Sequence, residues 1–107
     1  MKDIAIQRLD ENRYRLAGSI TFATVTAAYQ NEDLDLTSRD GIEIDLTDVS
    51  RVDSAGLALL LEWIRAAGAS GGRVRFTSIP VQLERLIQVA GLEEVFAGAE
   101  LMTNGTT

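Results

Sequence analysis

Residues 45–64 read DLTDVSRVDSAGLALLLEWI, and this stretch decides the fold. It begins at the end of a segment, from Ile42 to Leu46, in which apolar and acidic residues alternate, as is typical of a strand with one buried face. A short polar loop is predicted next, and an apolar-rich helix begins at Asp53 and Ser54. The stretch therefore joins a strand, a loop and a helix.

The start of this helix is the most distinctive polar position in the chain. The first backbone N–H groups of a helix lack intrahelical partners and carry partial positive charge, so they attract a capping oxygen or an anion. Either Asp53 or Ser54 can supply that oxygen, and the sequence does not choose between them. The Ser54 hydroxyl is therefore read either as a plain helix cap or as part of a binding site.

The predicted helix has an apolar surface wider than one sheet can cover. At 100° per residue its main apolar face collects Leu57, Leu60, Leu61 and Ile64. Leu59 and Trp63 extend the surface sideways, so that the apolar arc is roughly twice the ~100° stripe that packing on one sheet requires. Trp63 is then either a core residue or, with Leu59, a partly exposed residue at a partner surface, where tryptophan is enriched.

The rest of the chain predicts a sheet with helices on one face. Two short apolar segments separated by residues 10–12 indicate a hairpin whose second strand ends at Gly18, and a weak helix should follow from Thr21. A further strand at residues 74–76 and a helix after Pro80 complete the order β-β-α-β-α-β-α, with a short closing element at residues 92–96. The predicted fold class is α/β with α+β character: a mixed, mainly parallel sheet with helices packed on one face.

Composition limits the domain organisation and the partners. A chain of 107 residues with 46% apolar residues is expected to form a single domain over residues 1–101, followed by a flexible tail at 102–107. The net charge of −6 and the scattered Lys and Arg residues argue against nucleic acid. Membrane insertion is not expected, because no apolar run approaches the roughly 20 residues of a membrane span. With no cysteine and no signal-peptide pattern, a cytoplasmic location is expected.

Catalysis is not expected, because the chain contains no histidine and no cysteine. A phosphate-binding loop of the GxxxxGK[ST] type is also absent, and we predict no cofactor. Asp45, Asp48 and Asp53 form the one carboxylate cluster that could suit a hard cation such as Mg²⁺, if they meet at one edge of the sheet. Acids in loops more often cap turns and helices, so neither a metal site nor a catalytic residue is predicted.

The stretch from Asp45 to Leu57, with an Asp-Leu strand end followed by Asp-Ser-Ala-Gly-Leu, resembles the STAS family, which is named for sulfate transporters and anti-sigma factor antagonists. The order of elements agrees over nearly the whole chain, from about Ile4 to Phe96. Within the family, residues 49–61 are most similar to the small STAS subunits of the phospholipid ABC transporters that maintain lipid asymmetry. The resemblance implies a STAS fold and a non-enzymatic protein that binds and stabilises the transporter's ATPase subunit.

The resemblance also implies the site residues, and an alternative. Partner contacts are expected around the helix start and along its flank, at Arg51, Asp53, Ser54, Ala55, Gly56, Leu59 and Trp63. In the alternative, the chain is an anti-sigma factor antagonist whose Ser54 is phosphorylated by an anti-sigma factor kinase, although the like charge of Asp53 opposes that modification. An exposed apolar flank would also permit self-association.

Overall fold

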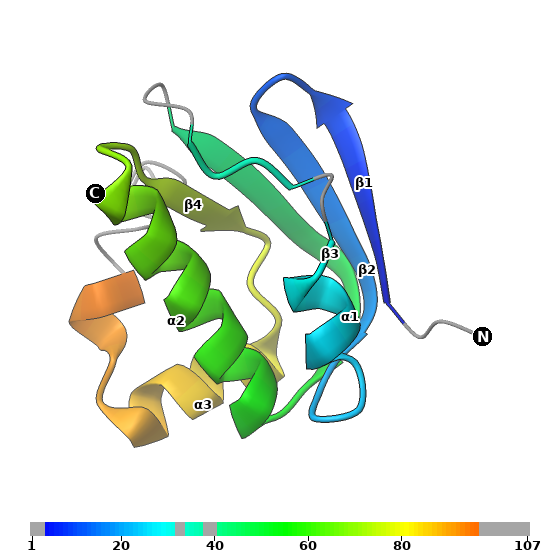
Figure 1. The fold of residues 1–107 in the computed structure, drawn as a ribbon. Helices are drawn as coiled ribbons and strands as arrows, with labels where there is room; N and C mark the ends of the chain where they lie inside the picture. The colour runs from blue at the N-terminus through cyan, green and yellow to red at the C-terminus, as the bar shows by residue number, and fades with distance from the viewer. Residues whose placement is uncertain (1–3, 32–33, 38–40, 97–107) are drawn as a thin grey trace.

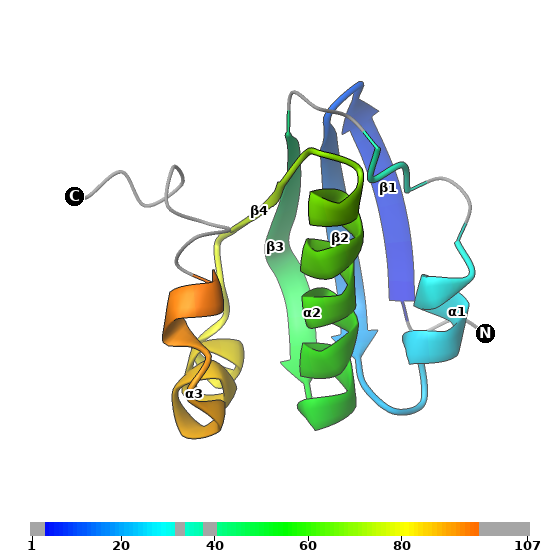
Figure 2. The same cartoon turned by 60° about the vertical axis from the view of Figure 1, so that its left-hand side comes forward.

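A computed structural model describes residues 4–31, 34–37 and 41–96. Its elements, in chain order, are β1 (Ile4–Asp10), β2 (Arg13–Ile20), α1 (Val25–Tyr29), β3 (Ile42–Val52), α2 (Ser54–Ala69), β4 (Val74–Thr77) and α3 (Val81–Ala90). The sheet has the order β1-β2-β3-β4; β1 pairs antiparallel with β2, whereas β2, β3 and β4 are parallel. Helices α1, α2 and α3 lie on one face of this sheet (Figure 1, Figure 2). The predicted fold class is confirmed, whereas the predicted tail at 102–107 lies outside the described residues.

The N-terminal hairpin forms where the polar residues predict it. The Asp10 carboxylate accepts a hydrogen bond from the Asn12 backbone N–H at 3.0 Å, which fixes the turn between β1 and β2. The prediction that Gly18 ends the second strand is wrong, because β2 continues to Ile20. Gly18 has a φ of 99° beside a shift in the register between β2 and β3, so it marks an irregularity within the strand.

Strand β3 is longer than the alternating pattern indicated. The prediction of a polar loop after Leu46 is wrong, since the strand continues to Val52 and pairs with β2 as far as Ile20. Two register irregularities in this pairing change the spacing of the inward-facing residues from two to three, so that Val49 and Val52 are buried after Leu46. A search for strict alternation therefore stops six residues too early.

The first helix is only five residues long and begins at Val25, four residues after the predicted start. Its first turn is organised by Thr24, whose hydroxyl accepts a hydrogen bond from the Thr21 N–H and donates one to the Ser19 carbonyl oxygen. Ala28 is buried, but Phe22 and Tyr29 are 83% and 63% exposed. The predicted helical face is therefore only partly used for the core, in keeping with the β-branched residues that weaken the helix.

Helix α2 lies across the middle of the sheet, between α1 and α3 (Figure 2). Its buried arc is centred on Leu60 and Trp63, which are 0% and 3% exposed, whereas Leu61 and Ile64 are only half-buried. The helix is therefore rotated relative to the predicted face. Its wide apolar arc is covered by the sheet below it and by a helix on each side.

Helix α3 and Phe96 close the core as predicted, but Val95 of the predicted closing element is 42% exposed. Pro80 precedes the first turn, and Gly91 ends the helix in the left-handed conformation with a φ of 72°. The Gln82 side-chain oxygen accepts a hydrogen bond from the Val52 N–H at 2.9 Å and so connects α3 to the end of β3. Phe96 is buried, and its ring centroid lies 6.0 Å from that of Phe76 on β4.

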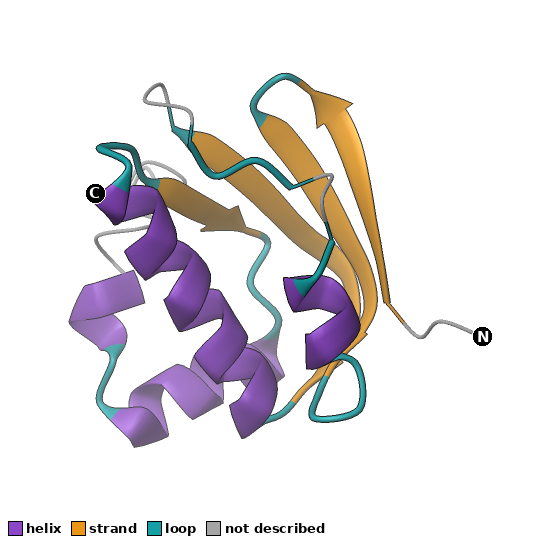
Figure 3. Cartoon of the chain, viewed as in Figure 1, coloured by secondary structure: helices purple, strands orange, loops and turns teal. Residues whose placement is uncertain are grey.

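The outer face of the sheet carries polar side chains, and none of the three helices covers it (Figure 3). Ion pairs cross between its strands: Arg15 of β2 lies 3.4 Å from Asp45 of β3, and Arg75 of β4 lies 2.9 Å from Glu43 of β3. The inward-facing residues of the same strands form the core. No helix within the described ranges is long and apolar enough to cross a membrane.

Candidate functional site

The helix start that the sequence singles out lies at the carboxyl end of β3. Asp53 adopts an extended conformation there, and its Oδ1 atom accepts a hydrogen bond from the Gly56 N–H at 3.0 Å. Of the two possible caps, Asp53 is therefore the cap and Ser54 is the first residue of α2. The Ser54 side chain is exposed and makes no hydrogen bond with any described residue, so its hydroxyl is accessible from solvent.

Asp53 also holds the loop between β2 and α1. Its Oδ2 atom accepts a hydrogen bond from the Phe22 N–H at 3.0 Å, and its own N–H donates to the Ile20 carbonyl oxygen at 3.3 Å. The backbone N–H groups of Phe22 and then Gly56 lower the pKa of the Asp53 carboxyl; the positive charge of Arg51 adds to this effect, and desolvation opposes it. The carboxylate therefore fixes two segments that are about thirty residues apart in the sequence.

Gly56 allows α2 to approach β2 closely. A Cβ atom at this position would lie 2.0 Å from the Ile20 carbonyl oxygen, far inside van der Waals contact. Only glycine fits here without a shift of the helix or of the strand end. The Asp-Ser-Ala-Gly sequence therefore has two structural roles, a cap at Asp53 and a close contact at Gly56.

An apolar groove lies beside the helix start, between α1 and α2. Its volume is about 310 Å³, and its lining includes Val25 and Tyr29 from α1 and Ala55, Ala58 and Leu59 from α2. Glu62 also lines the groove, and the Arg65 guanidinium binds its carboxylate and lowers its pKa. Tyr29 lines the groove, the Phe22 backbone is held beside the helix start by Asp53, and both side chains are exposed.

The structure brings only part of the predicted site to the surface. Arg51 and Ser54 are exposed and Ala55 is partly exposed, whereas Gly56 is buried. The expectation that Leu59 and Trp63 form an exposed flank is wrong, because they are 6% and 3% exposed. Trp63 lies in the middle of the buried arc, and Leu59 lies at the bottom of the groove against α1.

The exposed apolar residues near the helix start are instead Phe22 and Tyr29, which the sequence pattern assigns to the buried face of a helix. The signal that could have found them is the weak helix propensity of Thr24, Val25 and Thr26. Because the helix begins only at Val25, Phe22 lies before its first turn and Tyr29 is its last residue. The two residues therefore do not share the buried face of one helix. Both rings are therefore exposed.

The three aspartates of the predicted carboxylate cluster do not meet. Asp45 lies on the outer face, where its Oδ1 atom accepts hydrogen bonds from the Thr47 N–H and hydroxyl at 2.9 and 2.6 Å. These bonds and the neighbouring Arg15 lower the pKa of Asp45, against the effect of desolvation, which is the largest single contribution. The extended strand separates Asp45 from Asp53 by about 26 Å, at ~3.3 Å per residue. No group of three acidic side chains in the described part of the chain is placed to hold a metal ion.

Comparison with protein families identifies the domain. The family model described as "Mlab, STAS domain" matches residues 5–102. The chain belongs to this STAS family. No curated protein matches the sequence significantly.

Solved structures share the fold of this STAS domain. An anti-sigma factor antagonist from Mycobacterium paratuberculosis is 22% identical with a TM-score of 0.68, and the match covers 87% of this chain and 80% of that one. The unphosphorylated anti-sigma factor antagonist SpoIIAA is 17% identical with a TM-score of 0.62, over 89% and 94% of the two chains. SLC26A9 is 18% identical with a TM-score of 0.65; 78% of this chain is matched, but it spans only 16% of that protein.

Proposed function

We propose that this STAS domain is a non-enzymatic binding subunit that docks on the ATPase of a phospholipid ABC transporter, on the cytoplasmic side of the membrane. The match to the MlaB-type family model supports this assignment. The observation that carries it is the exposure of Phe22 and Tyr29 in the loop and helix beside the start of α2, since removing such apolar surface from water when a partner covers it lowers the free energy. The protein contributes a surface to the complex and no chemistry.

The proposed docking surface consists of Phe22, Tyr29, Ser54, Ala55 and Ala58. Aromatic side chains bury about 150–250 Å² each and are frequent among the residues that dominate binding energy. The small residues of α2 leave room in the groove for a side chain of the partner. Ser54 belongs to this surface as a small exposed hydroxyl, and Arg51 lies near it as a charged residue that affects the rate of encounter.

Asp53, Gly56, Leu59 and Trp63 support this surface from within. Asp53 holds the loop that carries Phe22, and Gly56 sets the position of the helix start. Leu59 and Trp63 are core residues that keep α2 in place. In this proposal Asp53, Gly56 and Trp63 act on partner binding through the fold, whereas Leu59 also lines the bottom of the groove.

Co-purification with the cognate ATPase tests the proposal. We expect Phe22→Asp and Ser54→Arg to abolish binding while the circular dichroism spectrum and the urea midpoint stay close to wild type. Val89→Asp is the matched control, because Val89 is 87% exposed on α3, away from the docking surface, and undergoes the same change from apolar to acidic. Unchanged binding in both folded docking-surface variants would refute the proposal. Size-exclusion chromatography of the isolated chain separates partner binding from self-association through the same surface.

The alternative function is that of an anti-sigma factor antagonist controlled by phosphorylation of Ser54. The accessible Ser54 hydroxyl supports it, as does the fold shared with two anti-sigma factor antagonists. Intact-mass measurement after incubation with the cognate kinase and ATP would show one added phosphate in the wild type and none in Ser54→Ala. The neighbouring genes also separate the two functions: an ATPase and a permease favour the first, and a kinase-like anti-sigma factor favours the second.

A further inference from the structure

A second groove, which is polar, lies on the outer face of the sheet, at the end where β2, β3 and β4 begin. It has a volume of about 420 Å³, and its lining includes Arg13, Glu43, Arg73 and Arg75, with Asp10 and Asn12 at the hairpin turn. We call it the arginine groove. It is at the opposite end of the parallel strands from Ser54, so it is separate from the docking surface.

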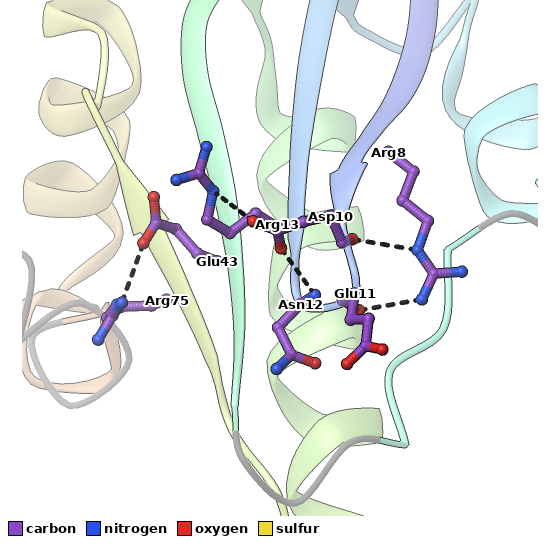
Figure 4. A network of polar contacts seen from close by, with 7 residues as sticks. All are labelled: Arg8, Asp10, Glu11, Asn12, Arg13, Glu43 and Arg75. Carbon is purple, nitrogen blue, oxygen red and sulfur yellow. Dashed lines mark hydrogen bonds and ion pairs between the residues drawn. The ribbon is translucent and has the colours of Figure 1, made fainter.

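The strand register places charges of opposite sign next to one another in this groove. Arg13 is paired with Glu43 across β2 and β3, and Glu43 with Arg75 across β3 and β4. Figure 4 shows the ion pairs Glu43–Arg75 and Arg13–Asp10 on this face. With Arg73, three guanidinium groups face two carboxylates, so the groove carries a net charge of +1 in a chain whose net charge is −6.

Several of the guanidinium donors have no strong acceptor. Within the described residues, the Arg73 side chain makes no ion pair, and the buried Nε atom of Arg75 has no hydrogen-bond partner. Arg13 contacts Asp10 at 3.4 Å with both side chains more than half exposed, and exposed pairs of this kind contribute only about 0–1 kcal/mol. Meanwhile Asp10 is held in the turn by the Asn12 N–H. Arg13 can therefore exchange Asp10 for a stronger acceptor at small cost.

We propose that the arginine groove binds a phosphate group through Arg13, Arg73 and Arg75. Guanidinium groups match the geometry of phosphate oxygens and form paired, charge-assisted hydrogen bonds with them. A phosphate in the groove accepts hydrogen bonds from the guanidinium groups of Arg13 and Arg73, whereas the buried Nε–H of Arg75 can join them only if its guanidinium moves from its present position against Glu43. Glu43 opposes the bound anion and so limits the affinity.

NMR titration of the whole chain with inorganic phosphate tests this proposal, and vesicles of phosphatidylcholine with and without phosphatidylglycerol test whether a lipid headgroup supplies the phosphate. We expect shifts that cluster at residues 13, 41–43 and 73–75. Arg73→Glu should weaken binding at least tenfold, because one charge-assisted partner becomes a like charge. Arg85→Glu is the matched control, since Arg85 is exposed on α3 and undergoes the same charge change.

A second pair of variants tests the opposite direction. Glu43→Gln keeps an oxygen acceptor for Arg75 and removes the opposing charge, so phosphate should bind about fivefold more tightly. Glu84→Gln on α3 removes the same charge elsewhere and should leave the affinity unchanged. The proposal is supported if phosphate or phosphatidylglycerol vesicles bind to the wild type and this binding is lost in Arg73→Glu. Which of the two binds shows whether free phosphate or a lipid headgroup supplies the phosphate group. Absence of both, or equal effects of test and control variants, overturns it.

Discussion

The Gly56→Ala substitution tests the packing of the helix start most directly. The added methyl group would lie 2.0 Å from the Ile20 carbonyl oxygen, about 1.4 Å closer than the 3.4 Å at which ordinary contact begins. Because the obstacle is backbone, the start of α2 or the end of β2 must move. Inserting a methyl group into a tightly packed site costs about 1–3 kcal/mol, and alanine regains up to about 1 kcal/mol of helix propensity. Offsetting the cost by this gain, we expect a net loss of up to about 2 kcal/mol.

Urea denaturation measures this loss, with an expected decrease of about 1 M in the midpoint at an unchanged m-value. Gly68→Ala is the internal control, because Gly68 lies in the same helix with nothing within 4 Å of the added methyl group. That variant should gain up to about 1 kcal/mol. If Gly56→Ala is as stable as Gly68→Ala, then the contact with Ile20 does not determine the position of α2.

Three further predictions concern the surroundings of the site. Asp53→Ala should lower the free energy of unfolding by about 0.5–2 kcal/mol at pH 7. Because the pKa of Asp53 is lowered in the folded protein, the stabilisation by its carboxylate is complete above the unfolded pKa of about 3.9 and is lost as the pH falls through the folded pKa. The urea midpoints of variant and wild type should therefore converge in acid. Trp63→Ala should lower the free energy of unfolding by about 3–5 kcal/mol in urea denaturation, because Trp63 is a core residue; an exposed contact residue would cost far less. Tyr14→Phe should cost about 0.5–1.5 kcal/mol and speed hydrogen exchange at the Asp35 N–H, which donates to the Tyr14 hydroxyl at 3.1 Å.

The sequence predicted the fold wherever one local signal was strong. The polar turn at residues 10–12, Pro80 with Gly91, and the apolar helix after Asp53 each require one conformation, and their order defines the sheet and the helices. Besides the start of α1, two boundaries were wrong because they depend on contacts distant in the sequence. The end of β3 at Val52 depends on irregular pairing with β2, and β2 extends to Ile20, where it pairs with Val52 and where Gly56 packs against its carbonyl oxygen.

The site was predicted less completely than the fold. The motif located the helix start correctly, but it did not show that Asp53 uses both carboxylate oxygens or that Phe22 lies beside it. The sequence alone leaves Trp63 open between core and surface, because a helical projection gives the width of an apolar arc and not the direction of its centre. That direction depends on what packs on either side, which is α1 and α3.

The two hydrogen bonds of Asp53 imply a thermodynamic linkage between the loop at Phe22 and the helix start at Ser54. A negative charge placed on Ser54 would repel this carboxylate and compete for the Gly56 N–H, which loosens the loop. Suppose that a partner binds only when the loop is in its present position. Linkage then requires that the charge on Ser54 weaken partner binding by the same factor by which bound partner disfavours the charge. Comparing partner affinity in Ser54→Asp and Ser54→Asn, each with and without Asp53→Asn, would measure this coupling free energy as a double-mutant cycle.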